Sequence, residues 1–272
     1  MRSGALFRNG NCRKGRARPT ADNGKYLREK GKSLLTNPAK AGFLYFIGRT
    51  VSRVKGSDTA PEQAKTTEAQ ELHIYLIRHG ETDWNTKLLF QGHSDTKLNK
   101  SGIRQAGYIA REFKGRKIDA IISSDLKRAY DTARIIASAC GCAGIKRDKR
   151  LRERDYGSLE GRRYELYRDR KSDFDGENDR RFFARVNRAF DDIVRKYQGR
   201  DILIVTHGGV VRQIVSHVLG LKDYKKLRIY NSSISEVFYN EKKKAFFLLH
   251  LNGVAHLPKA QRNKIEYHIK GV

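Results

Sequence analysis

Short apolar runs alternate with segments of helical spacing along most of this chain, and this alternation limits the folds that it can adopt. The runs at residues 72–78, 118–122 and 202–205 are each followed by a segment in which apolar residues recur with a helical period. Strands that alternate with helices form largely parallel sheets, because each helix carries the chain back across one face of the sheet. The sequence therefore predicts a three-layer α/β/α fold with a central, mostly parallel sheet between helices on both faces.

The individual elements follow from the spacing of the apolar residues. Ile103, Ala106, Ala110 and Phe113 recur with helical spacing, so a helix is expected over residues 101–113. Further helices are expected over residues 125–139, 183–197 and 209–219. The last two strands are expected over residues 235–239 and 246–251, at the edge of the sheet or antiparallel to their neighbours.

The first 70 residues differ in composition from the rest of the chain. Gly, Arg, Lys, Asn and Ser dominate there without a lasting helical or strand period, so residues 1–40 are expected to be disordered. A short basic amphipathic helix over residues 40–55 could touch a membrane surface or fold back on the remainder. We therefore expect a basic extension and linker over residues 1–70 and a folded domain over residues 71–272.

The chain is strongly basic, with 57 Lys and Arg against 30 Asp and Glu and a net charge of +27. Residues 1–70 hold 15 basic and 5 acidic residues, so about +10 lies in the extension and about +17 in the remainder. Such a field attracts phosphorylated small molecules, nucleic acid or anionic membranes. Nonspecific contact of residues 1–70 with polyanions or anionic membranes is one expectation, and a solvated basic surface is the alternative.

Cysteine content and apolar runs bear on the compartment. Three cysteines, Cys12, Cys140 and Cys142, are too few and odd in number for a disulfide framework, which favours a reducing compartment. No apolar run approaches the roughly 20 residues that span a bilayer, and no apolar segment typical of a secretory signal follows the first arginines. These features indicate a cytoplasmic protein, with an organelle transit peptide in the Arg-rich start as the alternative.

An Arg and a His stand side by side where the first strand ends, in the sequence Arg78-His79-Gly80. In open α/β sheets, ligands bind outside the carboxyl ends of the strands. A guanidinium fits phosphate oxygens bidentately, an imidazole can attack phosphorus, and a glycine lets the backbone approach an anion. His207 likewise ends the strand at 202–205, and the helix that opens with Gly208 directs its N–H groups towards an anion.

The order of such blocks resembles the histidine phosphatase superfamily, the phosphoglycerate mutase-like proteins, and its phosphatase-type members in particular. The resemblance covers about residues 72–258. It is carried by residues 76–85, Gln91-Gly92, Leu98, Gly102, Gln105-Ala106, residues 123–129, Thr132-Ala133, residues 151–153, Tyr156-Gly157, Glu160-Gly161, residues 205–209, Asn231, Asn252 and His256-Leu257.

The resemblance implies a phosphomonoesterase that needs neither metal nor cofactor and works through a phosphohistidine. It gives His79 the role of nucleophile, His207 that of stabilising the phosphoryl group, and Glu153 that of general acid and base. The implied phosphate-binding residues are Arg78, Asn85, Gln91, Gly92, Arg128 and Gly208. Capping of a turn is an alternative role for Asn85.

Glu153 has alternatives that the residues alone leave open. Its carboxylate could form an ion pair with Arg152 or Arg154, and Asp155 is the nearest rival for the role of proton donor. The spacing of Leu151 and Glu153 before Tyr156-Gly157 matches the family and favours the catalytic role.

The reaction itself can be a hydrolysis or a phosphoryl transfer. Mutases of the family cover the phosphohistidine with a long segment between the acid and the second histidine, and here Glu153 and His207 are only 54 positions apart. The sequence thus favours a phosphatase for a small phosphorylated metabolite over a phosphoglycerate mutase. A basic protein that binds anions or nucleic acid on a phosphatase fold is the remaining alternative, although no known nucleic-acid motif is present.

Overall fold

The computed structural model of the chain describes residues 71–142, 144–167, 175–221 and 227–262, together with the backbone of residues 45 and 46. Within these residues, seven strands form one sheet in the order β1-β7-β6-β2-β5-β3-β4. The strands are β1 (Tyr45–Phe46), β2 (Glu71–Arg78), β3 (Ala120–Ser123), β4 (Ile145–Arg147), β5 (Asp201–Thr206), β6 (Ile234–Asn240) and β7 (Ala245–Gly253).

The half of the sheet that carries the candidate site is parallel. β2 pairs with β5, β5 with β3 and β3 with β4, all in parallel register. β6 and β7 add antiparallel strands beside β2, as the sequence predicted for the last two strands. The carboxyl ends of β2, β5 and β3 therefore meet along one edge.

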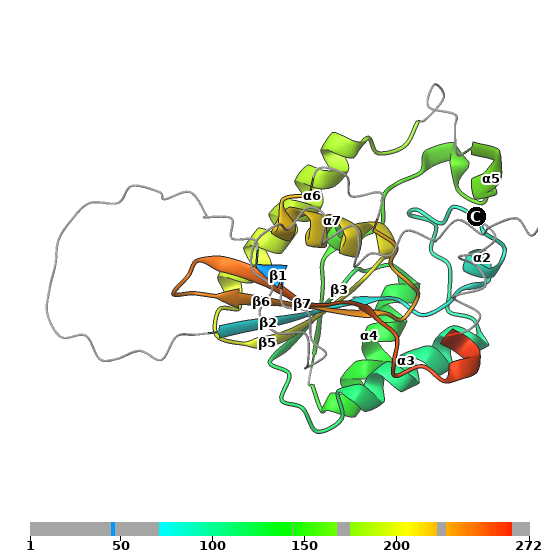
Figure 1. The fold of residues 1–272 in the computed structure, drawn as a ribbon. Coiled ribbons are helices and arrows are strands. Elements are labelled where there is room, and N and C mark those ends of the chain that lie inside the picture. Colours follow the sequence, from blue (N-terminus) through cyan, green and yellow to red (C-terminus); the bar gives the residue numbers. More distant parts are fainter. Residues whose placement is uncertain (1–44, 47–70, 143, 168–174, 222–226, 263–272) are drawn as a thin grey trace, which may run out of the picture.

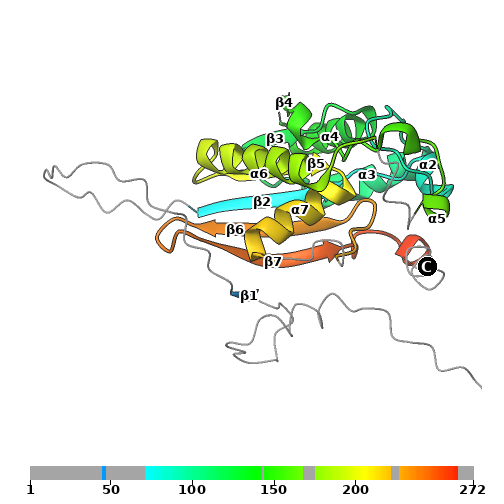
Figure 2. The same ribbon diagram turned by 90° about the horizontal axis from the view of Figure 1, so that it is seen from above.

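Helices cover both faces of the sheet (Figure 1). They are α2 (Asp83–Thr86), α3 (Lys100–Glu112), α4 (Lys127–Cys140), α5 (Tyr164–Tyr167), α6 (Asp179–Lys196) and α7 (Gly208–Leu219), with the 3-10 turns η1 (Lys149–Leu151) and η2 (Gly157–Leu159). The pair α6 and α7 lies on one face and the pair α3 and α4 on the other, which Figure 2 shows from above. The predicted three-layer α/β/α fold is confirmed.

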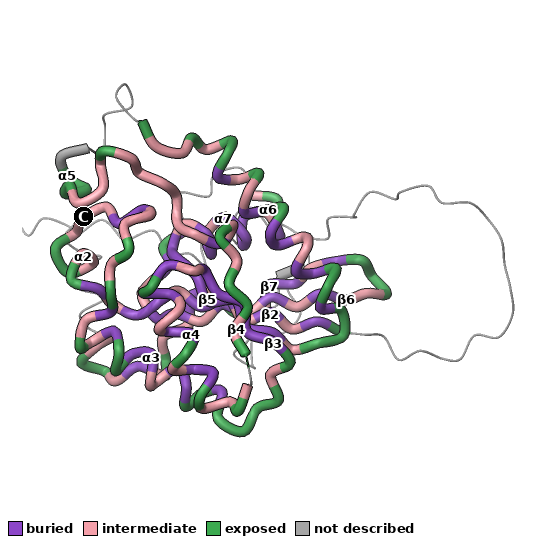
Figure 3. Tube along the Cα trace, turned by 180° about the vertical axis from the view of Figure 1, so that it is seen from behind, coloured by how far each residue is buried: buried purple, intermediate pink, exposed green. Residues whose placement is uncertain are grey.

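Side chains that alternate along the strands pack into two separate hydrophobic cores, one on each face of the sheet. Ile74 and Leu76 of β2 pack in the cluster with α6 and α7, whereas Ile77 packs in the cluster with α3 and α4. This is the two-residue period of a strand that is covered on both faces. Figure 3 shows the buried trace running through the sheet, with exposed residues on the outer sides of the helices.

The helix ends follow local capping rules. The side chain of Asn99 accepts from the Gly102 amide at the start of α3, and that of Asn178 accepts from the Arg181 amide at the start of α6. α4 begins at Lys127, two residues later than predicted, and ends at Cys140. The next residue, Gly141, adopts the left-handed conformation typical of a helix end. No helix among the described residues is long and apolar enough to cross a bilayer.

One apolar position of the predicted α3 face is wrong. Ile103 is 52% exposed, whereas Ala106, Ala110 and Phe113 are buried as predicted. The buried face also includes Gln105 and Ile109, and Ile103 lies outside it because it is two residues from Gln105 on the helix. The predicted helix and its helical period are therefore correct, but Ile103 does not belong to the buried face.

The predicted amphipathic helix over residues 40–55 is wrong where the structure describes it. Residues 45 and 46 form β1, which pairs antiparallel with β7 through Tyr45 with Leu248 and Phe46 with Phe247. The outer edge of β7 offers unpaired backbone groups that an extended segment can satisfy. The rest of the extension, including the predicted disorder of residues 1–40, lies outside the described residues, and the division at residue 70 stays a prediction.

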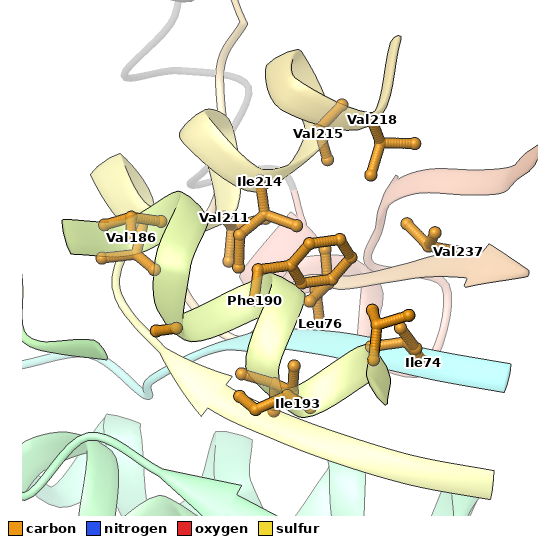
Figure 4. Close-up of a cluster of buried hydrophobic side chains, with 14 of the residues drawn as sticks. Ile74, Leu76, Val186, Phe190, Ile193, Val211, Ile214, Val215, Val218 and Val237 are labelled. Carbon is orange, nitrogen blue, oxygen red and sulfur yellow. The ribbon is translucent and has the colours of Figure 1, made fainter. Parts of the chain in front are cut away.

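The core between α6 and the sheet makes a direct test of this arrangement. Phe190 is fully buried and lies between Ile214 of α7 and Ile74 and Leu76 of β2 (Figure 4). Phe190→Ala should lower the free energy of unfolding by about 3–5 kcal/mol, because it removes a buried ring and leaves a cavity. Chemical denaturation measures this loss, and Ile103→Ala is the matched control. A loss below about 1 kcal/mol for Phe190→Ala would contradict the packing.

Candidate active site

The parallel pairing of β2 with β5 places two histidines beside each other. Arg78 lies opposite Thr206 in the register, and the His79 amide donates to the Thr206 carbonyl at 2.9 Å. His79 and His207 each follow by one residue, so their rings meet edge to face with centroids 5.2 Å apart. Two residues that are 128 positions apart in the sequence are thus joined at one sheet edge.

His79 is held in one ring orientation. Its Nδ1 donates to the Gly80 carbonyl at 2.7 Å, and the side chain is buried. Because the carbonyl can only accept, the Nδ1 carries the proton and the lone pair of the neutral ring lies on Nε2. This is the protonation state that a nucleophilic imidazole needs.

Gly80 and Gly102 make the close approach of this turn to α3 possible. A Cβ on Gly80 would lie 2.5 Å from the Gly102 carbonyl oxygen, and one on Gly102 would lie 2.1 Å from the Glu81 carbonyl oxygen. Both glycines are needed because the opposing atoms belong to the backbone and cannot move aside. The turn after His79 is thereby fixed against the helix.

Both imidazoles are kept neutral. Burial lowers the pKa of His79 well below its usual value, and the positive charges of Arg128 and Arg78 lower it further, against the opposing Gly80 hydrogen bond. Burial and then the charge of Arg128 likewise lower the pKa of His207 well below its usual value. Protonation of a buried imidazole next to two guanidinium groups is unfavourable, because it would add a positive charge without solvent or a counter-ion.

The two candidate phosphate clamps come from different elements and keep part of their hydrogen-bonding capacity unused. Arg78 Nη1 donates to the Ile229 carbonyl at 2.6 Å, and Arg128 donates to the carbonyls of Ser94 and Gly92, both at 2.8 Å. Arg128 is fully buried, and burial lowers its pKa to about 10, so it stays cationic at neutral pH.

Three buried polar atoms around His79 lack partners among the described residues. They are Nε of Arg78, Nε of Arg128 and Nδ1 of His207. A buried polar group without a partner costs about 1–3 kcal/mol, and more when it is charged, so such groups call for a ligand or another explanation. The oxygens of a phosphoryl group are acceptors that would satisfy the two guanidinium N–H groups.

Gln91 and Gly92 belong to the loop that holds Arg128. Gln91 Oε1 accepts from the hydroxyl groups of Thr82 and Thr96 at 2.9 and 2.7 Å. Gly92 has φ +48°, and a Cβ there would lie 1.9 Å from a carboxylate oxygen of Glu160, so only glycine fits. These contacts make both residues part of the Arg128 support, and their direct contact with phosphate stays a prediction.

Glu160 fastens the same loop from its amide side. Its carboxylate accepts from the amides of His93 and Ser94, both at 2.7 Å, and from the Ser94 hydroxyl. Arg128 donates to the carbonyls of Ser94 and Gly92 in the same loop. The amides of the loop therefore bind a carboxylate, and its carbonyls bind a guanidinium.

Asn85 caps α2 with Thr82. Its Oδ1 accepts from the Thr82 amide and from Asn231 Nδ2, each at 3.1 Å, which is the capping role weighed from the sequence. The residue also lines a cavity of about 570 Å³ next to Arg78. A phosphate contact of Asn85 stays a prediction.

The start of α7 holds the Glu153 side chain at the site. Its Oε2 accepts from the Gly209 amide at 2.9 Å and its Oε1 from the Arg154 amide at 3.0 Å. A Cβ on Gly209 would lie 2.2 Å from Glu153 Oε1, so the helix start must be glycine for the carboxylate to dock. Gly208 is similarly close to Arg78, with a Cβ position 3.3 Å from Nε.

The arginines beside Glu153 are paired elsewhere. Arg152 donates twice to Asp125, at 2.7 and 2.5 Å, and Arg154 Nη1 donates to Asp179 at 2.5 Å. The two arginines thus form ion pairs with Asp125 and Asp179 in place of the ion pairs with Glu153 that the sequence left open. Asp155, the rival acid, accepts from the Gly157 amide at 2.8 Å and lies 3.8 Å from His93 Nδ1.

Two residues that sequence reasoning did not assign also shape the site. Ser124 Oγ lies 2.8 Å from His207 Nε2, at the end of β3. Arg185 of α6 donates to the carbonyls of Arg150 and Arg152 at 2.7 and 2.9 Å, and to both carboxylate oxygens of Glu177. The signals for Ser124 were its place after a buried strand and in the block of residues 123–129 that resembles the family, and a helical arginine such as Arg185 gave none.

Among the described residues, no group of three or more His, Cys, Asp or Glu side chains is arranged to hold a metal ion. The groups nearest the His79 ring are the His207 imidazole and the Arg78 and Arg128 guanidiniums, and these suit binding of an anion.

Residues 74–252 match the histidine phosphatase superfamily, branch 1. That stretch is about two thirds of the chain, so the chain belongs to this superfamily, which includes both phosphatases and mutases.

Proteins similar to this chain are named as mutases and as phosphatases. A protein of Enterobacter sp. (strain 638) named as a probable phosphoglycerate mutase, GpmB, is 40% identical over 186 residues, which are 62% of this chain and 86% of that protein. The solved phosphoserine phosphatase of Entamoeba histolytica, a mutant in complex with phosphoserine, is 26% identical with a TM-score of 0.62, covering 69% of this chain and all of that one. The α-ribazole phosphatase of Shigella flexneri is 28% identical with a TM-score of 0.60, covering 66% and 96% of the two chains.

The neutral state of His79 can be measured by its titration. The folded pKa lies below the unfolded value of about 6.5, so the unfolded state binds more protons in this window, and stability is lost as the pH falls from 6.5 towards the folded pKa. The imidazole NMR signals of His79 should stay those of a neutral ring down to pH 6.

Removal of a neighbouring charge gives the matched test of the cause. Arg128→Gln should move the His79 titration to higher pH, because the Arg128 charge contributes to the lowered pKa. A wild-type midpoint at or above 6.5 would contradict the burial and charge argument.

Proposed function

We propose that this chain is a metal-independent phosphomonoesterase that hydrolyses a small phosphorylated metabolite through a phosphohistidine at His79. The observation that carries the proposal is a neutral His79 between Arg78 and Arg128, each with a buried Nε that lacks a partner among the described residues. A phosphoryl group in this position would receive charge-assisted hydrogen bonds around the attacking imidazole.

The first half of the reaction uses the lone pair on His79 Nε2. It attacks phosphorus while the bond from phosphorus to the ester oxygen breaks, and Glu153 in its acid form gives its proton to the leaving alkoxide. Arg78 and Arg128 would stabilise the equatorial oxygens, whose charge is spread in the transition state. His207 lies beside His79 on the neighbouring strand, where it can hold another phosphoryl oxygen.

The second half returns the enzyme to its starting state. Glu153, now a carboxylate, takes a proton from water as the water oxygen attacks the phosphohistidine, and the bond from phosphorus to His79 breaks. Inorganic phosphate leaves, and Glu153 is again protonated. The carboxylate is held for this exchange by the Gly209 and Arg154 amides.

Mutase-type transfer is the alternative, since the GpmB relative is named as a phosphoglycerate mutase. What supports hydrolysis is the short connection from Glu153 to His207. Much of this connection is α6 (Asp179–Lys196), which packs its apolar face on the core. A mutase must exclude water from its phosphohistidine while its product rebinds, and a short connection offers little chain for this task.

A nucleophile substitution with a chelation control tests the class of enzyme. His79→Ala should lower hydrolysis of p-nitrophenyl phosphate by about 10³-fold or more, because the covalent route is lost. His250→Ala, on an exposed position of β7, is the matched control. EDTA should leave the wild-type rate unchanged, so full activity of His79→Ala or complete loss on chelation would refute the mechanism.

The proton donor is tested by the dependence on the leaving group. Glu153→Gln should slow alkyl phosphates by about 10²–10⁴-fold and p-nitrophenyl phosphate far less, because a poor leaving group needs the proton most. Steady-state kinetics on both substrates gives the comparison, with Asp155→Asn as the control. Equal slowing of both substrates by Glu153→Gln would exclude it as the donor, and the expected pattern in Asp155→Asn would transfer the role.

A further inference from the structure

Ser124 takes no part in the reaction steps assigned to His79 and Glu153, yet its side chain contacts the second histidine. It directly follows β3 and is fully buried. Its Oγ lies 2.8 Å from His207 Nε2, and the Leu126 amide donates to the same oxygen at 3.3 Å. Among the described residues, no other hydrogen bond to the His207 ring is present. The state of that ring therefore depends on this hydroxyl.

The partners of the Ser124 hydroxyl decide the direction of its hydrogen bonds. The Leu126 N–H can only donate, so Oγ accepts there and the hydroxyl proton is left for another group. Within the described part of the chain, the acceptor in reach of that proton is His207 Nε2. A buried hydroxyl that donates to nothing is unfavourable, so the O–H of Ser124 donates to Nε2.

This direction fixes the position of the proton on His207. Burial and then the charge of Arg128 lower the pKa of His207 well below its usual value, so the ring is neutral and carries one N–H. Because Nε2 accepts from Ser124, its lone pair is there and the proton is on Nδ1. Nδ1 is buried and, like the Nε atoms of Arg78 and Arg128, has no partner among the described residues. It is therefore a third unused donor close to His79.

We propose that Ser124 is a positioning residue that holds His207 in the Nδ1–H tautomer, so that Nδ1 donates to an oxygen of the phosphoryl group bound at His79. This inference rests on the proposed phosphatase function and adds how the second histidine acts in it. In the opposite tautomer the lone pair would be on Nδ1 and would repel the phosphoryl oxygen. The hydroxyl of Ser124 thus makes the difference between a donor and a repelling acceptor at the same atom.

The two histidines then have the same tautomer for different purposes. At His79 the Gly80 carbonyl accepts from Nδ1 and leaves the lone pair of Nε2 free for attack. At His207 the Ser124 hydroxyl donates to Nε2 and leaves the proton of Nδ1 free for the substrate. An acceptor on one ring and a donor on the other therefore produce a nucleophile and a neutral hydrogen-bond donor side by side.

Nitrogen-15 NMR of the imidazole rings measures the tautomer directly and needs no turnover. The His207 signals, assigned by their absence from His207→Gln, should show a protonated Nδ1 and an unprotonated Nε2 in the wild type. Ser124→Ala should mix or invert the two forms, because Nε2 loses its donor, and Ser124→Thr should restore the wild-type form, because it keeps the hydroxyl. A protonated Nε2 in the wild type, or an unchanged tautomer in Ser124→Ala, would overturn the inference.

Ser123 provides the matched control. Its hydroxyl is equally buried but donates to the Ser124 carbonyl at 2.8 Å. Ser123→Ala therefore makes the same chemical change one residue away and should leave the His207 signals as in the wild type. Saturation with inorganic phosphate should shift the signal of the His207 Nδ1 proton in the wild type, and an unchanged signal would overturn the donation to a phosphoryl oxygen.

A double-mutant cycle tests whether Ser124 acts through His207. Loss of one donor to a transition-state oxygen costs about 10²–10³-fold in kcat, so a donor that is only partly lost should cost at least about tenfold. Ser124→Ala should show this loss on p-nitrophenyl phosphate, and Ser123→Ala should stay within about twofold. In the His207→Ala protein, Ser124→Ala should cost about twofold or less. Equal losses in both backgrounds would show that Ser124 acts by another route and overturn the inference.

The same data separate this inference from the proposed function. Turnover by a wild type with an unprotonated Nδ1 would keep the phosphatase and refute the tautomer. A protonated Nδ1 that responds to Ser124→Ala and to inorganic phosphate, in a protein that hydrolyses no phosphate ester, would keep the role of Ser124 and refute the phosphatase.

Discussion

The parallel pairing of β2 with β5 is the interaction on which the whole site depends. It sets the Arg78–Thr206 register, and from that register His79 and His207 follow at the same level of one sheet edge. β3 pairs with the other side of β5 and brings Ser124 to His207 and the start of α4 to the same edge. A shift by one residue would turn these side chains to opposite faces, so the buried strand faces that fix the register also fix the chemistry.

The site gathers like charges and leaves donors unused, and the surrounding fold must hold it together. Arg128 is a fully buried cation whose guanidinium is oriented by two loop carbonyls, while Glu160 fixes the same loop through its amides. Burial, and then the positive charges of Arg128 and Arg78, lower the pKa values of His79 and His207 and keep both rings neutral. An anion between Arg78 and Arg128 would relieve the repulsion of the same charges that lower the pKa of His79.

The sequence predicted the layers and the sheet edge because these depend on periods of two and of about 3.6 residues. It predicted the neighbourhood of Arg78, His79, Arg128 and His207 because each lies at or shortly after the carboxyl end of a strand at one edge. It misplaced Ile103, since a single apolar residue beside a helical face satisfies the period without being buried. It missed β1 and Arg185 because pairing with β7 and donation to distant carbonyls depend on tertiary contacts that leave no local pattern.

Contacts with α7 hold Glu153 at the sheet edge that carries His79 and His207. Its carboxylate accepts from the Gly209 amide at the start of α7, directly after His207, so Glu153 and His207 share one helix end. Arg185 fixes the carbonyls around Glu153 from α6, which packs against α7. The spacing between Glu153 and His207 is therefore set by packed helices and not by the length of the chain between them.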